Sequence, residues 1–362
     1  MTSLSADVGE ITKLVSAGLL APSGDNCQPW RFLWNGESLQ IHFVPERAES
    51  LYDVQHTASW IALGALLTNL RIAANTLGCQ LHIDVFPDQE TSPLVAQVRW
   101  QRQPTCDDPL FPALTARCVN RRPYRRAPLP SQVKAELLSL ASTAPGVSLD
   151  LLEDEPKKSA LASLAAVNER ILFENRALHD GLYRWLRWTT HETTRTGDGM
   201  PVESLELSGL ERPGFRILAS WPITRGLTAL GLTSMLPWRT QRVYQRSAAI
   251  GLLTVNGTRP EDFVRGGELL ERLWLTATLR DVAFQPITGI TFLWLRCRLA
   301  QGDGLSARHQ KLLDNVWHQL AELLPSSMQQ TPIMLFRLGL ASAPSGRALR
   351  RPVASVLTTV TP

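Results

Sequence analysis

The spacing of apolar residues changes several times along the chain, and each change marks a new element. In some segments apolar positions recur at helical spacing, and in others they alternate with polar ones as in a half-buried strand. In the first third the predicted elements are a helix over 8–20, strands over 30–34 and 38–44, a long helix over 57–77, and strands over 80–86 and 94–100. This order predicts an α+β unit and not a βαβ repeat.

Turn chemistry supports three of these boundaries. The residue before a proline disfavours the helical region, so the first helix should end at Ala21-Pro22. Asn35-Gly36 separates the two short strands and is a strong hairpin signal, because both turn positions need a positive φ. Gly78 follows the long helix in the position of a C-cap.

After a proline-rich stretch at 101–116, which we interpret as a linker, helices and strands return. The pattern predicts helices over 131–141, 156–187 with a break near Asn175, 260–278 and 306–324, and strands over 147–152, 250–255 and 332–338. The stretch 189–246, with repeated glycine and proline, is the least regular. Apolar helices with small residues at 61–78 and 267–282 form a weak internal echo, which indicates either a duplicated fold or a coincidence between two buried helices.

Composition narrows the class of protein. A chain of 362 residues that is 44% hydrophobic can form one large or two medium cores. The net charge of +4 permits attraction of an anionic ligand but is too weak to indicate a nucleic-acid partner. Five scattered cysteines and isolated histidines predict neither a disulfide framework nor a metal site. Without a signal peptide or an apolar run of about 18 residues, we expect a cytoplasmic protein with no membrane partner.

Candidate chemistry lies first in the segment 21–32, which joins a helix to a strand. Ser23, Asn26 and Gln28 place short hydroxyl and amide groups on this loop, and Gly24 frees its backbone. Such groups can present several donors and acceptors to a flat heterocycle. The alternative is a helix C-cap followed by turn-forming polar residues.

Three further segments carry candidate groups. Four arginines fall within the six residues 121–126, and their planar forks suit phosphate oxygens. The segment 284–289 is a proline turn after a helix, and 336–353 ends in a basic pair. Taken singly, these segments are equally typical of a solvated linker, an ordinary turn and an exposed tail.

Together the four segments resemble the FMN-dependent nitroreductase superfamily. Residues 21–32 match the signature A-P-S-x-x-N-x-Q-P-W-x-F, and 120–126 resemble R-R-S-x-R with Pro123 in place of the serine. Residues 284–289 resemble the P-x-x-G turn that faces flavin N5, and 336–353 are similar to the R-x-G and R-R-P ending. The resemblance implies one bound FMN and these cofactor-binding residues: Pro22, Ser23, Asn26, Gln28, Arg121, Arg122, Arg125, Pro286, Thr288, Gly289, Arg350 and Arg351.

The order of the signatures resembles the fused, Acg-like branch of this superfamily. The S-x-x-N-x-Q loop lies in a first half, 1–105, and the other three signatures lie in a second half, 117–362. One chain therefore holds the parts of one composite site. The resemblance implies a pseudo-dimer of two α+β halves with mostly antiparallel central sheets flanked by helices. It also implies a monomer or weak homodimer, with 189–246 as an insertion that could serve as a lid.

Two functions are consistent with this resemblance. The first is an oxidoreductase in which NADH or NADPH delivers hydride to flavin N5 and a small-molecule electron acceptor then removes it in a ping-pong scheme, so no catalytic side chain is assigned. The second is an FMN storage or sequestering protein whose flavin is covered by 189–246, with Trp221, Leu236 and Trp238 as candidates to cover the ring. A scaffold that has lost FMN is a more remote alternative. The absence of G-x-G-x-x-G after a strand gives no indication of a Rossmann site.

Overall fold

Two β-sheets, one in each half of the molecule, provide the framework of the fold. The computed structural model describes residues 7–88, 92–325 and 329–360, and every side chain in them except those of 234–236. The five-stranded sheet has the order β11 (Leu357–Thr359), β1 (Trp30–Trp34), β2 (Leu39–Phe43), β4 (Leu94–Arg102), β3 (Cys79–Val85). The four-stranded sheet has the order β5 (Val147–Leu152), β8 (Ala249–Val255), β10 (Thr331–Gly339), β9 (Ala283–Ile287). Within these sheets, strand pairs are antiparallel except β1 with β11.

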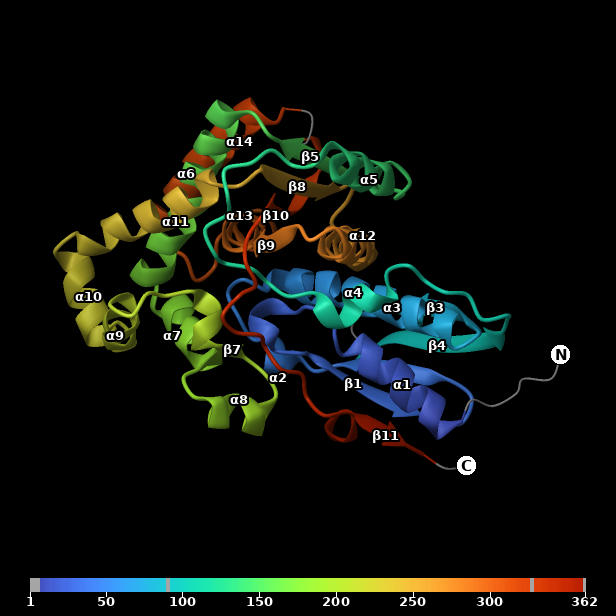
Figure 1. Cartoon of the computed structure of the whole chain (residues 1–362). Coiled ribbons are helices and arrows are strands. Elements are labelled where there is room, and N and C mark those ends of the chain that lie inside the picture. The colour runs from blue at the N-terminus through green and yellow to red at the C-terminus, as the bar shows by residue number, and fades with distance from the viewer. Residues whose placement is uncertain (1–6, 89–91, 326–328, 361–362) are drawn as a thin grey trace.

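Helices flank both sheets, and a separate helical lobe projects at one side (Figure 1). The first sheet is accompanied by α1 (Val8–Gly18), α2 (Pro45–Ala48), α3 (Thr57–Thr76) and α4 (Phe111–Ala116). The second sheet is accompanied by α5 (Ser131–Ser142), α6 (Glu155–Glu174), α12 (Pro260–Leu279), α13 (Gly289–Ala300) and α14 (Ala307–Leu323). The lobe contains α7 (Arg176–Trp185), the pair β6 (Leu186–Arg187) and β7 (Met200–Pro201), α8 (Thr190–Thr196), α9 (Glu211–Ile217), α10 (Trp221–Ala229) and α11 (Leu236–Gln245). The predicted α+β class with central, mostly antiparallel sheets is confirmed.

Differences from the sequence prediction occur mainly where turn residues begin helices. The segment 189–246 was expected to be the least regular part, but it contains four short α-helices and two short 3-10 helices. Three of its four prolines lie in the first turn of a helix: Pro213 in α9, Pro222 in α10 and Pro237 in α11. The missing N–H costs nothing there, and Pro201 belongs to β7. The expected break of 156–187 occurs at Asn175, whose side chain accepts a hydrogen bond from the N–H of Leu178 and caps α7. Helix α13 was not predicted at all.

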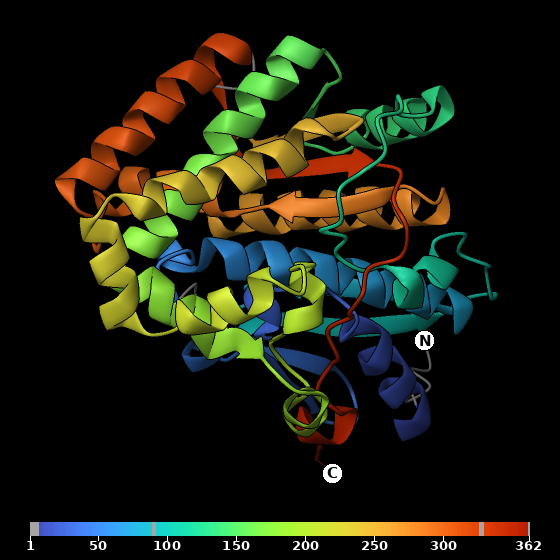
Figure 2. The ribbon, with the colours of Figure 1, turned by 60° about the vertical axis from the view of Figure 1, so that its left-hand side comes forward.

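The two halves meet where α3 and α12 lie side by side between the sheets (Figures 1 and 2). A Cβ atom on Gly64 of α3 would lie 2.0 Å from the carbonyl oxygen of Val264 on α12. Reciprocally, a Cβ on Gly267 of α12 would lie 2.0 Å from the carbonyl oxygen of Ile61 on α3. Each glycine thus opposes the residue three positions before the other glycine. A two-fold relation between two similar surfaces produces such a reciprocal contact.

The C-terminal segment crosses from the second half to the first. After β10 the chain descends past α4 in Figure 1 and ends as β11 on the edge of the first sheet. There Phe32 of β1 is paired with Leu357, and the N–H of Phe32 donates to the carbonyl oxygen of Val356 at 2.7 Å. The last strand of the predicted second half therefore belongs to the sheet of the first.

Helix α3 is the most apolar element of the core. Together with the turn before it, the range Val54–Thr76 is long and apolar enough to cross a membrane. However, 89% of its apolar window is buried inside the protein, between the first sheet and α12. Burial on all sides explains why the helix is apolar around its whole circumference.

The helix contact leads to a test of the core. Gly64→Ala should lower the free energy of unfolding by about 2 kcal/mol or more, because the new methyl group would collide with backbone that cannot rotate away. Gly226→Ala is the matched control, since a Cβ there meets no atom within 4 Å. This control should be neutral or stabilising by up to about 1 kcal/mol, the usual gain of alanine over glycine in a helix. Urea denaturation measures both, and equal stability of Gly64→Ala and wild type would contradict the close contact.

Candidate functional site

The loop that precedes β1 has an unusual backbone. Asp25, Asn26 and Gln28 have φ angles of 48°, 58° and 50°, which place all three in the left-handed region. Short polar side chains tolerate this region because they can bond locally, and such conformations concentrate at functional sites. The N–H of Gln28 donates to Oγ of Ser23 at 2.9 Å, which closes the turn. The loop therefore presents Ser23, Gly24 and Asp25 on one side and sends two amide side chains into the protein.

A cavity of about 540 Å³ lies between this loop and the second half of the chain. Ser23, Gly24 and Asp25 form one wall, and the segment 285–289 forms another. Asn168 and Glu169 of α6 and Tyr244 of α11 close it further. The outer wall includes residues of the lobe, namely Met200, Leu205, Leu207, Glu211, Gly214, Phe215, Leu218, Arg239, Thr240 and Val243. The volume is within the range of about 300–1,000 Å³ that small-molecule sites occupy.

A second cavity of about 240 Å³ adjoins the first and has basic walls. The two share Ser23, Gly24, Asp25, Ala58, Ala62, Arg121, Met200, Pro286, Thr288 and Phe292. Four arginines line the smaller cavity: Arg117, Arg121, Arg347 and Arg350.

The charges of these arginines are only partly balanced within the protein. Arg117 is paired with Glu271, with Nε 3.0 Å from Oε1, and both side chains are almost fully buried. Among the described residues, Arg121, Arg347 and Arg350 have no carboxylate within ion-pair distance. Burial next to Arg117 lowers the pKa of Arg350 to about 9, which leaves it charged at neutral pH. The smaller cavity is thus suited to an anion, and planar guanidinium groups match phosphate oxygens in particular.

The amino end of α13 meets the larger cavity. Pro286, Thr288 and Gly289 line it, and Thr288 is the N-cap of this 12-residue helix. The first N–H groups of a helix have no intrahelical acceptor and form the positive end of its dipole. Negative charge that develops on a ligand at this end would be stabilised.

Eight of the twelve residues implied by the resemblance line one cavity or both. These are Pro22, Ser23, Asn26, Arg121, Pro286, Thr288, Gly289 and Arg350. Four do not line either cavity: Gln28, Arg122, Arg125 and Arg351. The structure therefore places Arg350 at the smaller cavity and Arg351 at neither cavity. The sequence alone could not distinguish these two residues.

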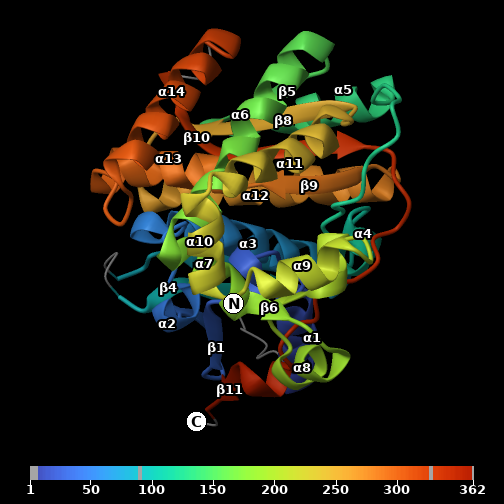
Figure 3. The ribbon, with the colours of Figure 1, turned by 90° about the vertical axis from the view of Figure 1, so that its left-hand side faces the viewer.

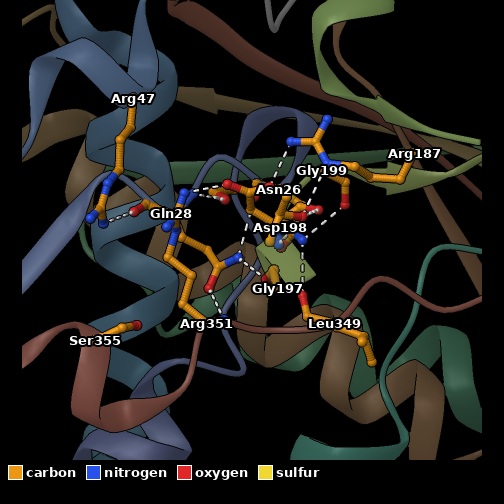
Figure 4. A network of polar contacts seen from close by, with 12 residues as sticks. Asn26, Gln28, Arg47, Arg187, Gly197, Asp198, Gly199, Leu349, Arg351 and Ser355 are labelled. Atoms are coloured by element: carbon orange, nitrogen blue, oxygen red, sulfur yellow. Dashed lines mark hydrogen bonds and ion pairs between the residues drawn. The ribbon is translucent and has the colours of Figure 1, made fainter. Parts of the chain in front are cut away.

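Asn26 and Gln28 hold together three segments that are distant in sequence (Figure 4). Nδ2 of Asn26 donates to the carbonyl oxygens of Gly199 and Leu349 at 3.0 and 2.9 Å. Nε2 of Gln28 donates to the carbonyl oxygen of Gly197 at 2.9 Å, and its Oε1 accepts from the N–H of Arg351 at 2.9 Å. Oδ1 of Asn26 is buried without a hydrogen-bond partner among the described residues, so it remains an acceptor for a ligand N–H.

A buried carboxylate strengthens this connection. Asp198 is paired with Arg187 at 2.6 Å and also with Arg351, and only 6% of its side chain is exposed. The carboxylate of Asp198 thus links Arg187 of the lobe to Arg351 of the C-terminal segment. Breaking such a buried pair would leave an uncompensated charge, which is costly. We call this network of Asn26, Gln28, Asp198, Arg187 and Arg351 the latch.

The other two predicted arginines lie away from the cavities. Nη2 of Arg122 donates to Oγ of Ser345 at 2.7 Å, and its Nε lies 3.6 Å from Glu206. Arg125 is exposed. Adjacent side chains of an extended segment point in opposite directions, which separates Arg122 from Arg121.

The aromatic residues proposed to cover a ring also lie elsewhere. Trp221 packs edge-on against His179, with ring centroids 5.2 Å apart, and Trp238 is 62% exposed. Neither lines a cavity, and the side chain of Leu236 lies outside the described residues.

Sequence reasoning missed two carboxyl groups in the larger cavity. Asp25 and Glu169 both line it, and neither has a hydrogen-bond or ion-pair partner among the described residues. Burial raises the pKa of Asp25 to about 6, although Arg121 opposes the shift. Burial likewise raises the pKa of Glu169. With a pKa of about 6, Asp25 can hold a proton in mildly acidic solution, and burial favours the protonated form of Glu169 as well. Asp25 could have been noticed from its place inside the predicted loop, whereas nothing in the sequence distinguishes Glu169.

Comparison with known proteins supports the predicted family. No family model matches the chain. The putative NAD(P)H nitroreductase acg of Mycobacterium tuberculosis is 24% identical over 297 residues, which are 81% of this chain and 83% of acg. The resemblance to acg-like nitroreductases is confirmed. Uncharacterized protein MT1398 of the same species is 29% identical over 341 residues, which are 93% of this chain but 47% of MT1398. The chain thus spans less than half the length of that relative.

Solved structures are only weakly similar. Oxidized iodotyrosine deiodinase bound to FMN and 3-iodo-L-tyrosine has a TM-score of 0.38 and 12% identity, and the match covers 67% of this chain and 95% of that one. The FMN-dependent nitroreductase NfnB from Mycobacterium smegmatis in complex with NADPH has a TM-score of 0.36 and 13% identity, with 67% and 94% covered. At these TM-scores the similarity gives no information about the site.

The raised pKa of Asp25 predicts a pH-dependent stability. A carboxyl with a pKa of about 6 when folded and about 3.8 when unfolded stabilises the protein below about pH 4, and this contribution is lost as the pH rises through about 6. Asp25→Asn should therefore match wild type near pH 4 and exceed its free energy of unfolding by about 2–3 kcal/mol above about pH 7. The exposed Asp107→Asn is the matched control. Urea titrations at several pH values measure the difference, and a gap that does not change with pH would disprove the shift.

Proposed function

We propose that the chain binds one FMN between its two halves and acts as an NAD(P)H-linked oxidoreductase. The observation that carries this proposal is the smaller cavity, where Arg121, Arg347 and Arg350 face one space without a carboxylate partner among the described residues. Such a set is typical of a phosphate site. Similarity to the putative nitroreductase acg supports the same assignment.

The residues present fit FMN at both ends. The arginines of the smaller cavity would hold the phosphate, and Asn26, which lines the same cavity, would offer its free Oδ1 to a hydroxyl of the chain that joins phosphate and ring. The larger cavity would hold the ring between Ser23 and the segment 286–289, with the amino end of α13 close by. That end stabilises negative charge where a reduced ring would carry it. Bound FMN would supply the redox chemistry, taking hydride from NADH or NADPH and passing it to a small-molecule acceptor in a ping-pong sequence.

The site would be composite, as in a dimer whose halves have been joined. The loop 23–26 comes from the first half, and Arg121 and Gly289 come from the second. The reciprocal contact of Gly64 and Gly267 supports a two-fold relation between the halves. One chain would then suffice for one site, which favours a monomer or weak homodimer. We propose that the protein is located in the cytoplasm.

A non-catalytic FMN store is the second candidate, and one observation favours it. Phe215, Leu218 and Val243 of the lobe form part of the outer wall of the larger cavity. The latch connects residues 187 and 197–199 of this lobe to residues 26–28 of the first half. A wall held in this way could keep nicotinamide away from a bound ring.

Anaerobic reduction separates the two candidates. NADH or NADPH added to the FMN-loaded protein without oxygen should bleach the flavin absorbance, because the open part of the larger cavity can admit a nicotinamide. The readout is absorbance in a stopped-flow instrument, and dithionite serves as the control reductant. A yellow protein that only dithionite bleaches would favour storage.

Single arginine variants test the phosphate site. Arg121→Ala should weaken FMN binding at least tenfold, since a charge-assisted contact contributes about 1.5–3 kcal/mol. Arg122→Ala and Arg125→Ala are matched controls from the same segment and should retain FMN, because neither lines a cavity. Equilibrium dialysis gives the affinities. Loss of FMN from all three variants alike would point to the family pattern and against this geometry.

A further inference from the structure

Exposed apolar side chains gather on the part of the lobe formed by residues 207–246, which we call the outer lobe. Among the described residues, half of the twelve large hydrophobic side chains that are exposed belong to it. Leu210 is 94% exposed, Leu230 75% and Trp238 62%, and the others are Ile217, Ile223 and Leu232. Exposed apolar residues are ordinarily scattered, so such a concentration marks an interaction surface.

The same segment is strongly basic. It contains the arginines 212, 216, 225, 239, 242 and 246 against the single acid Glu211, a net charge of +5 that exceeds the +4 of the whole chain. Arg239 is paired with Glu211, and Arg212 with Glu203 outside the segment. Among the described residues, the other four have no carboxylate within ion-pair distance. Arg242 instead lies over the ring of Trp238 at 4.6 Å, which joins a cation to the apolar surface.

The outer lobe is placed to make an external contact. Helices α9 and α10 project from the side of the molecule in Figure 1 and face the viewer in Figure 3, away from both sheets. The inner side of the lobe packs on α6 and α7, where Thr224 is fully buried. The exposed apolar side chains and arginines of the outer lobe are those that this packing leaves uncovered.

The charge distinguishes between two possible occupants of this surface. A second copy would bring one segment of net charge +5 against another, and like charges in a self-complementary contact repel. An anionic lipid surface would attract these arginines and take up the leucines, isoleucines and tryptophan at the level of its headgroups. Tryptophan is enriched at this level because its ring is apolar and its N–H is polar.

We propose that the outer lobe docks this protein on an anionic lipid surface. The sequence predicted no membrane partner because it lacks a free apolar span, but a peripheral contact needs only a basic surface with apolar tips. Residues of the outer lobe also wall the larger cavity, so docking would bring that cavity close to the bilayer. The proposal does not depend on FMN binding.

Co-sedimentation of the full chain with lipid vesicles tests the proposal. We expect binding to vesicles of phosphatidylglycerol and phosphatidylcholine, none to phosphatidylcholine alone, and weaker binding as salt screens the arginines. Leu210→Ser with Leu230→Ser should lower the partition coefficient about a hundredfold, or about tenfold for each leucine that loses apolar contact. Arg225→Gln with Arg246→Gln should lower it about 25-fold, or about fivefold for each charge.

Matched variants outside the outer lobe provide the controls. Leu138→Ser with Leu279→Ser removes two other exposed leucines, and Arg126→Gln with Arg272→Gln removes two other exposed arginines. Both should bind as wild type does. Equal binding to the two kinds of vesicle, or equal loss in control and outer-lobe variants, would overturn the proposal. Light scattering that shows a dimer without lipid, dissolved by the outer-lobe variants, would identify a second copy as the occupant instead.

Discussion

The close contact of α3 with α12 is the constraint on which the arrangement of the site depends. Two glycines without side chains let the helix backbones touch, and this fixes how the halves are set against each other. The loop that precedes β1 meets the beginning of α3, where Ala58 and Ala62 line both cavities. The chain that follows α12 forms β9 and then α13, whose amino end reaches the same space. The elements that line both cavities are therefore positioned by the packing of these two helices.

The latch shows that Asn26 and Gln28 of the loop have a structural role besides the expected contact with a ligand. By resemblance Asn26 and Gln28 contact a flavin, yet in this structure their amide groups chiefly bind carbonyl oxygens of the lobe root and the C-terminal segment. Gln28 is fully buried and lines no cavity. Its side chain instead holds Gly197 and Arg351 beside the loop. Residues of a binding motif can thus hold the wall of a site in place as well as contact the ligand.

The sequence predicted the elements that depend on local signals. Period and turn chemistry predicted the hairpin, the two core helices and seven of the nine strands in the two sheets, but not β9 or β11. It did not predict α13, because this helix starts directly after β9 and continues the apolar run of the strand. Nor could it show that Arg347 joins Arg117 and Arg121 at one cavity, since Arg347 comes from the distant C-terminal segment. Which arginine faces inward is decided by backbone direction and tertiary contact.

The distribution of charge in the proposed site favours one orientation of a bound ligand. Basic groups gather in the smaller cavity, whereas the carboxyl of Glu169 lines only the larger one and that of Asp25 lines both. Of the other arginines that line the larger cavity, Arg239 is paired with Glu211. Arg47 donates to the carbonyl oxygens of Gln28 and Trp30, as the arginines of the smaller cavity also donate to backbone carbonyls. A ligand with one anionic end is therefore stabilised in one orientation and opposed in the other. Because Arg121 belongs to both cavities, its charge lies where the anionic end and the remainder of such a ligand would join.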